Sequence, residues 1–319
     1  MLKRISIRKL SISCFTLVVL LLMYMLPNNV KDLDVDKSIE YKTVNSDNLS
    51  SIFLMDNNEY IAMTNIVVDN GKDVCSKARE LVKALIIDGE KQDIIPNGFK
   101  PIIPAGTSIN DIHFDNGVIK VDFSSELLEV SEKYEEKMIE SICYTLTSID
   151  GVDNILIYVD GKMLTKLPNS GKFLPEILNR NYGINKQVNI SDYKNVVSLN
   201  VYYTKVFNDN YYYVPVTKYV NSSEDKVKII IDELSSAPTY EENLMSFLNS
   251  NTELINYTLD NNVLSLQFNE YLVDDINTMS ISNEVKEAIS YSMRDNFNIN
   301  EIIFSIGDKE ISKSCDFSK

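Results

Sequence analysis

Two long segments of this chain, residues 51–160 and 198–311, show the same order of apolar patterns, and this duplication constrains the fold more than any other feature. Alternating apolar residues are typical of half-buried strands, and apolar residues three or four positions apart are typical of helices covered on one face. In each segment these patterns follow the order ββ-α-ββ-α-β. A chain that repeats one order of elements is expected to contain two copies of one module.

The first copy begins with a hairpin whose turn, residues 56–58, reads Asp-Asn-Asn, and these residue types favour chain reversal. Its second hairpin turns at Asn116 and Gly117, a strong signal for a tight turn. The loop at residues 96–106 contains three prolines, which exclude a helix interior and a central strand there. The expected elements are strands at residues 52–55 and 60–68, a helix at 74–86, strands at 109–114 and 118–123, a helix at 134–146 and a strand at 155–159.

The second copy repeats this order, and its second hairpin aligns residue by residue with that of the first. Residues 116–123 read NGVIKVDF and residues 261–268 read NNVLSLQF. The expected elements are strands at residues 199–203 and 211–220, a helix at 227–234, strands at 254–259 and 263–268, a helix at 281–289 and a strand at 302–306.

Helices with one apolar face and strands with alternating apolar residues must cover each other to bury those faces. The predicted fold class is therefore α+β, with two tandem sheet-and-helix modules. Residues 28–50 are polar and are expected to be a linker. Residues 161–197, rich in proline and glycine, are expected to be an irregular linker between the copies, and residues 312–319 a tail.

The N-terminus has the pattern of a membrane anchor. Four basic residues precede an apolar run from Leu10 to Leu26, which is long enough to span a bilayer as a helix. No small-residue cleavage pattern follows Leu26, so residues 1–27 are predicted to be a retained signal anchor, with the basic end inside and the bulk of the chain outside the cytoplasm. The alternative is a buried core helix.

The charge balance limits the classes of partner. The chain has 46 acidic and 31 basic residues, a formal net charge of -15. Such a surface repels nucleic acid and anionic lipid headgroups, so both are poor partners for the part beyond the anchor. A basic protein or a cation fits this charge better.

The residues that most often carry chemistry are scattered. His113, the single histidine, alternates with Ile112 and Phe114 and is expected to face solvent without a nucleophile beside it. Asp122 is expected to be a solvated strand residue or a cap for the following helix through Ser124 or Ser125. We therefore predict no catalytic, cofactor or metal site. Cys75 and Cys143 fall on two predicted helices. The sequence is compatible with two alternatives, a pair of buried free thiols or one disulfide between them.

Tyrosines cluster on the first hairpin of the second copy, and three of them are the candidate partner surface: Tyr203, Tyr211 and Tyr213. Tyrosine offers a large contact area at a low cost in conformational entropy and dominates many interfaces. The alternative is that these residues fill the core, because strands favour aromatic residues in any case.

Several motifs of the first copy together resemble the GerM sporulation family, whose members carry tandem GerMN domains. These motifs are Ile103–Thr107 (IPAGT), Asn116–Ser124 (NGVIKVDFS), Thr145–Thr147 (TLT) before Gly151-Val152, and Ile155–Gly161 (ILIYVDG). The resemblance implies a fold like the ring-building motif and a place in the apparatus that joins mother cell and forespore. Many family members carry a lipid anchor. This chain differs, since Cys14 lies near the start of the apolar run and forms no usable lipobox.

Three function classes follow. We expect a non-enzymatic, membrane-anchored assembly or scaffold protein of endospore formation, acting through protein partners in a membrane complex. The alternative is a module that binds peptidoglycan or another ligand and affects spore cortex and germination. A wall-active enzyme ranks last, because no paired acids or metal cluster are apparent.

Overall fold

The computed structural model describes residues 49–68, 73–208, 210–236, 244–275 and 277–314, and both copies lie in one compact unit, residues 45–319. The predicted anchor, residues 1–27, lies outside the described residues. Within the described ranges no helix is long and apolar enough to cross a membrane.

The first copy contains the expected two hairpins and two helices. Its elements are β1 (Leu49–Asp56), β2 (Ile61–Val67), α2 (Val74–Ala84), β3 (Phe99–Lys100), β4 (Ile109–Asp115), β5 (Val118–Phe123), α3 (Glu135–Leu146), β6 (Asn154–Val159) and β7 (Lys162–Met163), with short 3₁₀ turns η2 (Gln92–Ile94) and η3 (Ser125–Glu129).

The second copy repeats this order with a longer first hairpin. Between and within the copies lie η4 (Arg180–Tyr182), β8 (Gln187–Asn189), β9 (Val196–Phe207), β10 (Asn210–Asn221), α4 (Lys226–Ser235), β11 (Leu254–Asp260), β12 (Val263–Phe268), η6 (Glu270–Leu272), α5 (Asn283–Asn296), β13 (Glu301–Ile306) and β14 (Lys309–Ser314).

The predicted α+β class is confirmed, but the predicted order lacked a final strand in each copy. β7 and β14 pair antiparallel with β6 and β13. Sequence patterns missed β7 because it has two residues. They missed β14 because both of its faces are largely open to solvent, so it has no clear apolar alternation.

Each copy has a four-stranded sheet, in the order β4-β5-β6-β7 in the first and β11-β12-β13-β14 in the second. The parallel pairs β5–β6 and β12–β13 are connected through α3 and α5. Both second hairpins turn on two residues with positive φ, Asn116-Gly117 and Asn261-Asn262, as a tight hairpin with right-handed twist requires.

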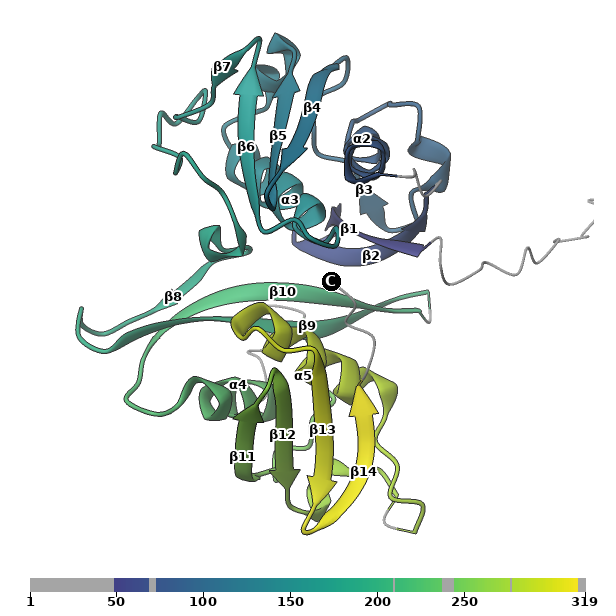
Figure 1. Ribbon diagram of the computed structural model, residues 1–319, viewed down its shortest axis with the longest axis vertical. Helices are drawn as coiled ribbons and strands as arrows, with labels where there is room; N and C mark the ends of the chain where they lie inside the picture. The colour runs from purple at the N-terminus through teal and green to yellow at the C-terminus, as the bar shows by residue number, and fades with distance from the viewer. Residues whose placement is uncertain (1–48, 69–72, 209, 237–243, 276, 315–319) are drawn as a thin grey trace, which may run out of the picture. The chain divides into compact units, whose positions relative to one another are not determined.

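The first hairpins of the two copies join into one shared sheet, which the sequence did not predict. β2 pairs antiparallel with β10 at Met63 and Tyr213, and β1 and β9 lie on the outer sides of these two strands. In Figure 1 the remaining elements of the first copy lie above this sheet and those of the second copy below it. The two copies are therefore continuous through their backbones.

Pro215 lies at the junction of the two hairpins, where the side chain of Asn185 provides hydrogen bonds that the proline backbone cannot make. Pro215 has no N–H to donate. The Asn185 amide accepts from the Ile61 N–H at 3.0 Å and donates to the carbonyls of Ile61 and Pro215, each at 2.8 Å. Asn185 has a φ of +46°, a left-handed value that asparagine tolerates better than most residues. The shared sheet is thereby completed by a residue of the connecting segment.

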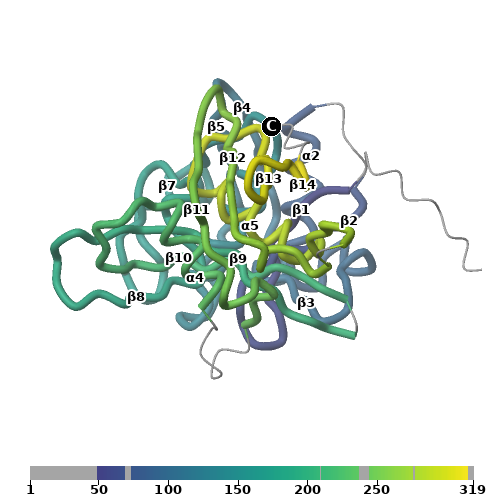
Figure 2. Tube along the Cα trace, turned by 90° about the horizontal axis from the view of Figure 1, so that it is seen from below, coloured from purple at the N-terminus to yellow at the C-terminus, as the bar shows by residue number. Residues whose placement is uncertain are grey.

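The connecting segment, residues 161–197, packs for much of its length against the first copy. Four of its apolar residues are buried in the hydrophobic core of the first copy: Leu167, Leu174, Leu178 and Ile184. Leu178 exchanges two backbone hydrogen bonds with Ile155, and β8 pairs parallel with β10. The turn between β8 and β9 projects beyond the sheets in two perpendicular views (Figures 1 and 2).

One contact is repeated in both copies and fixes the second helix to the first strand. The hydroxyl of Thr145 on α3 accepts from the Phe53 N–H at 3.0 Å, and that of Ser292 on α5 accepts from the Tyr202 N–H at 2.9 Å. The preceding helix residue forms an aromatic pair with the same strand residue in each case, at 5.4 Å for Phe53–Tyr144 and 5.5 Å for Tyr202–Tyr291. The duplication therefore extends to individual hydrogen bonds.

Candidate functional site

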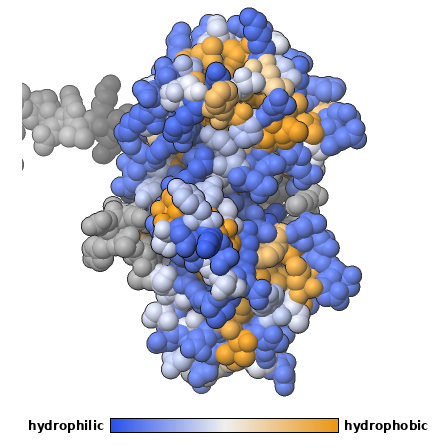
Figure 3. All heavy atoms as spheres, turned by 90° about the vertical axis from the view of Figure 1, so that its left-hand side faces the viewer, coloured by the Kyte–Doolittle hydropathy of each residue, from blue (hydrophilic) through white to orange (hydrophobic). Residues whose placement is uncertain are grey.

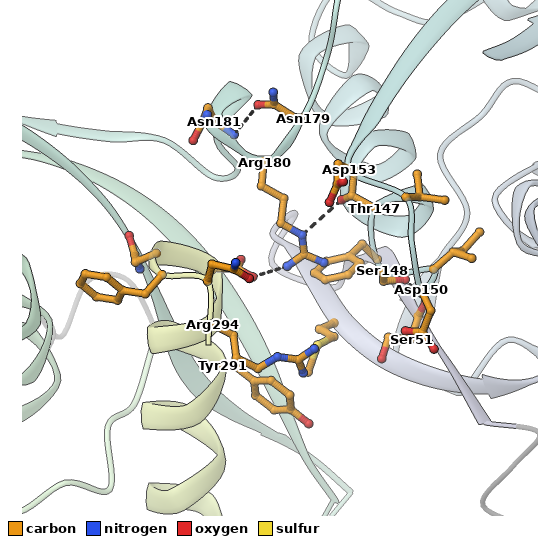
Figure 4. A pocket seen from close by; sticks show the side chains of 18 of the residues that line it. Ser51, Thr147, Ser148, Asp150, Asp153, Asn179, Arg180, Asn181, Tyr291 and Arg294 are labelled. Carbon is orange, nitrogen blue, oxygen red and sulfur yellow. Dashed lines mark hydrogen bonds and ion pairs between the residues drawn. The ribbon is translucent and has the colours of Figure 1, made fainter. Parts of the chain in front are cut away.

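A cleft of about 510 Å³ lies between the two copies on one face of the shared sheet. Its walls are the segment after α3 (residues 147–154), the end of α5 with the segment that follows (294–299) and residues 179–181 of the connection. The first two segments occupy equivalent positions in the two copies, since each follows the helix that packs on the first strand. Figure 4 shows the Arg180 side chain between the segment after α3, which carries Thr147, and α5, which carries Arg294.

Arg180 is the central residue of this cleft. Its guanidinium forms an ion pair with Asp295 of α5 and donates to the Thr147 hydroxyl at 3.2 Å. It also donates to the Tyr202 hydroxyl at 3.2 Å, which in turn donates to Asp295 at 2.7 Å. The guanidinium lies over the ring of Tyr144, 5.0 Å from its centre. One side chain of the connection thus contacts both copies.

The electrostatics of this group favour its charged form. Burial alone would lower the pKa of Arg180, but the Asp295 carboxylate offsets it, so that pKa is raised. The Asp295 side chain is 7% exposed and therefore depends on Arg180 for compensation of its charge. Burial raises the pKa values of Tyr144 and Tyr202 well above their ordinary range, so both stay neutral donors.

Neutral groups extend the network into the connection. The Tyr144 hydroxyl donates to the Arg180 carbonyl at 3.1 Å and accepts from the Asn200 amide at 3.1 Å. Thr217 of β10 donates to Asn200 at 2.6 Å and accepts from the Ile184 N–H at 2.8 Å. This chain of bonds runs from α3 to β9 and β10, so the two copies share a buried polar core as well as a sheet.

A second ion pair joins the copies at the end of β1. Lys205 of β9 contacts the Asp56 carboxylate at 2.8 Å, and both side chains are buried. The Tyr212 hydroxyl donates to the same carboxylate at 2.9 Å. The other Asp56 oxygen accepts from the N–H groups of Asn58 and Tyr60, which closes the β1–β2 turn.

The open part of the cleft is polar. Its walls include the amides of Asn179, Asn181 and Asn298, the carboxylates of Asp150 and Asp153, and the guanidinium of Arg294. Burial, together with the nearby Arg180, lowers the pKa of Arg294. This mixture of donors and acceptors suits a small polar ligand that both donates and accepts. Among the described residues no group of three or more His, Cys, Asp or Glu is placed to hold a metal ion.

A family model described as "Germane: Sporulation and spore germination" matches residues 51–165 and 200–312, both copies of the repeat. The chain belongs to the Germane family. It is 28% identical over 267 residues to spore germination protein GerM of Bacillus subtilis (strain 168), a match that covers 82% of this chain and 72% of that protein. It is also similar to the solved tandem GerMN domains of GerM from Bacillus subtilis, with a TM-score of 0.74 and 26% identity over 82% of this chain and 91% of that one.

The sequence resemblance to the GerM family is thereby confirmed, and the two copies are tandem GerMN domains. The family description names sporulation and spore germination and no catalytic activity.

The structure separates the residues that the sequence singled out. His113 is exposed on β4 of the first GerMN domain, where its register partner is Lys120. Asp122 on β5 accepts from the Gly161 N–H at 3.1 Å and so closes the β6–β7 turn. In the second GerMN domain Gln267 fills the same position and donates to the Gly307 carbonyl at 2.7 Å. Asp122 thus has a structural partner in the terminal turn.

The predicted tyrosine surface is wrong for two of its three members. Tyr203 is 1% exposed and Tyr213 is 8% exposed, whereas Tyr211 is 50% exposed. Tyr203 packs into the hydrophobic core of the second GerMN domain, and Tyr213 lies against the ring of Tyr291, with 5.2 Å between the ring centres. The reason is that the shared sheet is covered on both faces, so alternation along β9 and β10 buries the residues of either face. Cys75 and Cys143 are free thiols.

Sequence reasoning missed Arg180 and Asp295. Arg180 lies in an irregular segment and Asp295 near the end of a helix, positions where charged residues usually face solvent. One signal was available in the sequence. The connecting segment is not purely polar, because the apolar residues Leu174, Leu178 and Ile184 lie on both sides of Arg180.

Proposed function

We propose that this protein is a non-enzymatic assembly protein of endospore formation. In this proposal residues 1–27 hold it in the membrane, the GerMN domains lie outside the cytoplasm, and the domains hold protein partners in the channel apparatus between mother cell and forespore. The similarity to GerM, a spore germination protein by its printed name, supports a role in the same process.

One observation carries the proposal: the two GerMN domains form one body. The shared sheet, the Asn185 amide and the buried pairs Arg180–Asp295 and Lys205–Asp56 each join the domains. Domains of one chain commonly move relative to each other unless their interface is extensive. A fixed pair of domains suits a scaffold, because partners bound to each domain are held at one distance and orientation.

The test compares variants in cells that form endospores. Arg180→Met, which weakens the joint, is expected to lower spore formation and recovery of cross-linked membrane complexes. His113→Ala and Asp122→Ala are expected to be mild. If either of the latter abolished spore formation with the melting temperature unchanged, an enzymatic role would replace the scaffold.

The anchor is tested separately. Mass analysis of the membrane fraction is expected to find Asn28 still joined to the N-terminus. Recovery of a mature form that starts between Leu26 and Ser50 would contradict the retained anchor.

A second candidate is supported by the cleft itself. Its size and its mixture of amides, carboxylates and a guanidinium suit a peptidoglycan fragment, whose sugar hydroxyls and stem peptide both donate and accept. Titration of the full-length chain with soluble muropeptides tests this candidate. Asn181→Leu and Asn298→Leu, both at exposed positions, are expected to abolish binding without loss of stability. Unchanged binding in these variants would exclude the cleft.

A further inference from the structure

The outer edges of the two four-stranded sheets differ in how they are protected. Exposed sheet edges recruit other strands unless charges, short length or covering elements prevent it. β4 carries Asp111, His113 and Asp115 and is packed by α2. β7 has two residues, and β14 carries Lys309 and Lys313. Three of the four edges are therefore blunted.

β11 is the exception. It has seven residues, LINYTLD, and Asp260 at its end is its one charged side chain. Ile255 is 60% exposed and Leu259 is 48% exposed. Within the described residues β11 pairs with β12 alone, so its other edge presents free N–H and C=O groups. It forms the outer edge of the lower sheet in Figure 1.

The covering helix explains why the two domains differ here. In the first domain α2 packs against β4, and Ile112 on its inner face is buried. In the second domain α4 packs chiefly against β9 and α5 and makes at most slight contact with β11. Leu259, which pairs with the buried Leu264, therefore stays half open. A bulge at Ile255 disturbs one end of the strand and leaves residues 256–260 in regular register.

The surface on this side of the molecule is apolar in patches. Figure 3 shows the face that carries β7, β8 and β11, with apolar areas separated by hydrophilic ones. The charges at the two ends of β11 are both acidic, Glu253 before the strand and Asp260 at its end. Asp225 adds a third carboxylate near Tyr257, and burial together with this carboxylate raises the pKa of the Tyr257 hydroxyl. The net charge of -15 has the same sign.

We propose that β11 accepts an extended segment of another protein as a fifth strand of the second GerMN sheet. Its free backbone groups supply the ladder along residues 256–260, Leu259 supplies an apolar contact for a side chain of the incoming strand, and Ile255 adds exposed apolar surface at the bulged end. The carboxylates at both ends of β11 select basic residues at both ends of that segment. Self-pairing of two copies of this chain is disfavoured, because it would bring these carboxylates and two negatively charged bodies together. The inference rests on the proposed assembly role and names the docking edge for one partner.

The experiment is selection of a displayed library of random nine-residue peptides on the purified full-length chain. The enriched peptides are expected to alternate apolar and polar residues, to lack proline at central positions and to carry Lys or Arg near both ends. Leu259→Lys and Ile255→Lys place a charge on the edge at exposed positions. Each variant is expected to lower the binding affinity of the enriched peptides at least tenfold. Phe173→Lys is the matched control, since Phe173 is 79% exposed and lies outside β11.

Hydrogen exchange locates the bound peptide, and amides of residues 254–260 are expected to gain protection. Failure to enrich any such sequence, or equal binding to Leu259→Lys, would overturn the inference. So would a dimer that is abolished by Leu259→Lys, since the edge would then serve self-association. Each of these results leaves the assembly role standing. Peptide binding combined with normal spore formation in cells that lack the protein would instead remove the assembly role and keep the docking edge.

Discussion

Replacement of Arg180 by methionine tests how the two GerMN domains are joined. Methionine keeps part of the apolar stem but removes the charge that compensates Asp295, whose side chain is 7% exposed. Loss of one partner from a buried ion pair costs about 3 to 5 kcal/mol. The Arg180 side chain is 25% exposed, so water reduces this cost, and we expect about 3 kcal/mol of lost unfolding free energy.

Urea unfolding followed by circular dichroism measures this loss, and two further variants interpret it. Arg180→Met with Asp295→Asn removes both charges and keeps an acceptor for the Tyr202 hydroxyl, so it is expected to recover about 1 kcal/mol or more. Lys228→Met breaks an exposed pair with Glu224 at 3.2 Å and is expected to cost less than about 1 kcal/mol.

The shape of the transition is the second readout. Because Arg180 contacts both domains, its loss is expected to separate one cooperative transition into two. A single transition in Arg180→Met with a loss below about 1 kcal/mol would refute the reasoning, since the pair would then behave as an exposed one.

Three further predictions concern buried groups. Asn185→Ala leaves the Ile61 N–H and the Pro215 carbonyl without their partner, so unfolding free energy is expected to fall by about 3 kcal/mol in the same urea assay; a loss under about 1 kcal/mol would contradict its role in the shared sheet. Burial raises the pKa of Cys143 to about 12, so iodoacetamide at neutral pH is expected to label the half-buried Cys75 first and Cys143 only on unfolding, and equal rates by mass spectrometry would count against the buried site. Burial also raises the pKa of Glu140. The folded state therefore takes up this proton at a higher pH than the unfolded state, and stability gains as pH falls through the folded pKa; a Glu140→Gln variant is expected to lack that gain in urea midpoints measured against pH, and identical pH profiles would contradict it.

The elements within each domain could be predicted because local patterns determine them. Asn116-Gly117 specifies a tight turn, and the apolar spacing of α3 and α5 follows from one covered face. The joint between the domains could not be predicted in this way. Met63 pairs with Tyr213, and the two residues are separated in sequence by about half the length of the chain. No local sequence pattern indicates which edge of β10 pairs with β2.

The candidate site was hidden for the same reason. Arg180, Thr147 and Asp295 converge only because the shared sheet brings the ends of α3 and α5 to one cleft. The exposure of the tyrosines was wrongly predicted, because alternation along a strand separates its two faces but does not show whether other elements cover each face. Tyr203 and Tyr213 are buried on opposite faces of one sheet, and Tyr211 near the hairpin end stays half exposed.

The central claim is that the two GerMN domains form one fixed body, and a distance distribution tests it most directly. Spin labels at His113→Cys and Thr258→Cys, exposed positions on β4 and β11, report one distance between the domains when the four native cysteines are replaced by alanine. Pulsed electron resonance is expected to give a single narrow distribution, as a shared sheet requires. A broad distribution, or two populations, would show that the domains move independently and would contradict the account.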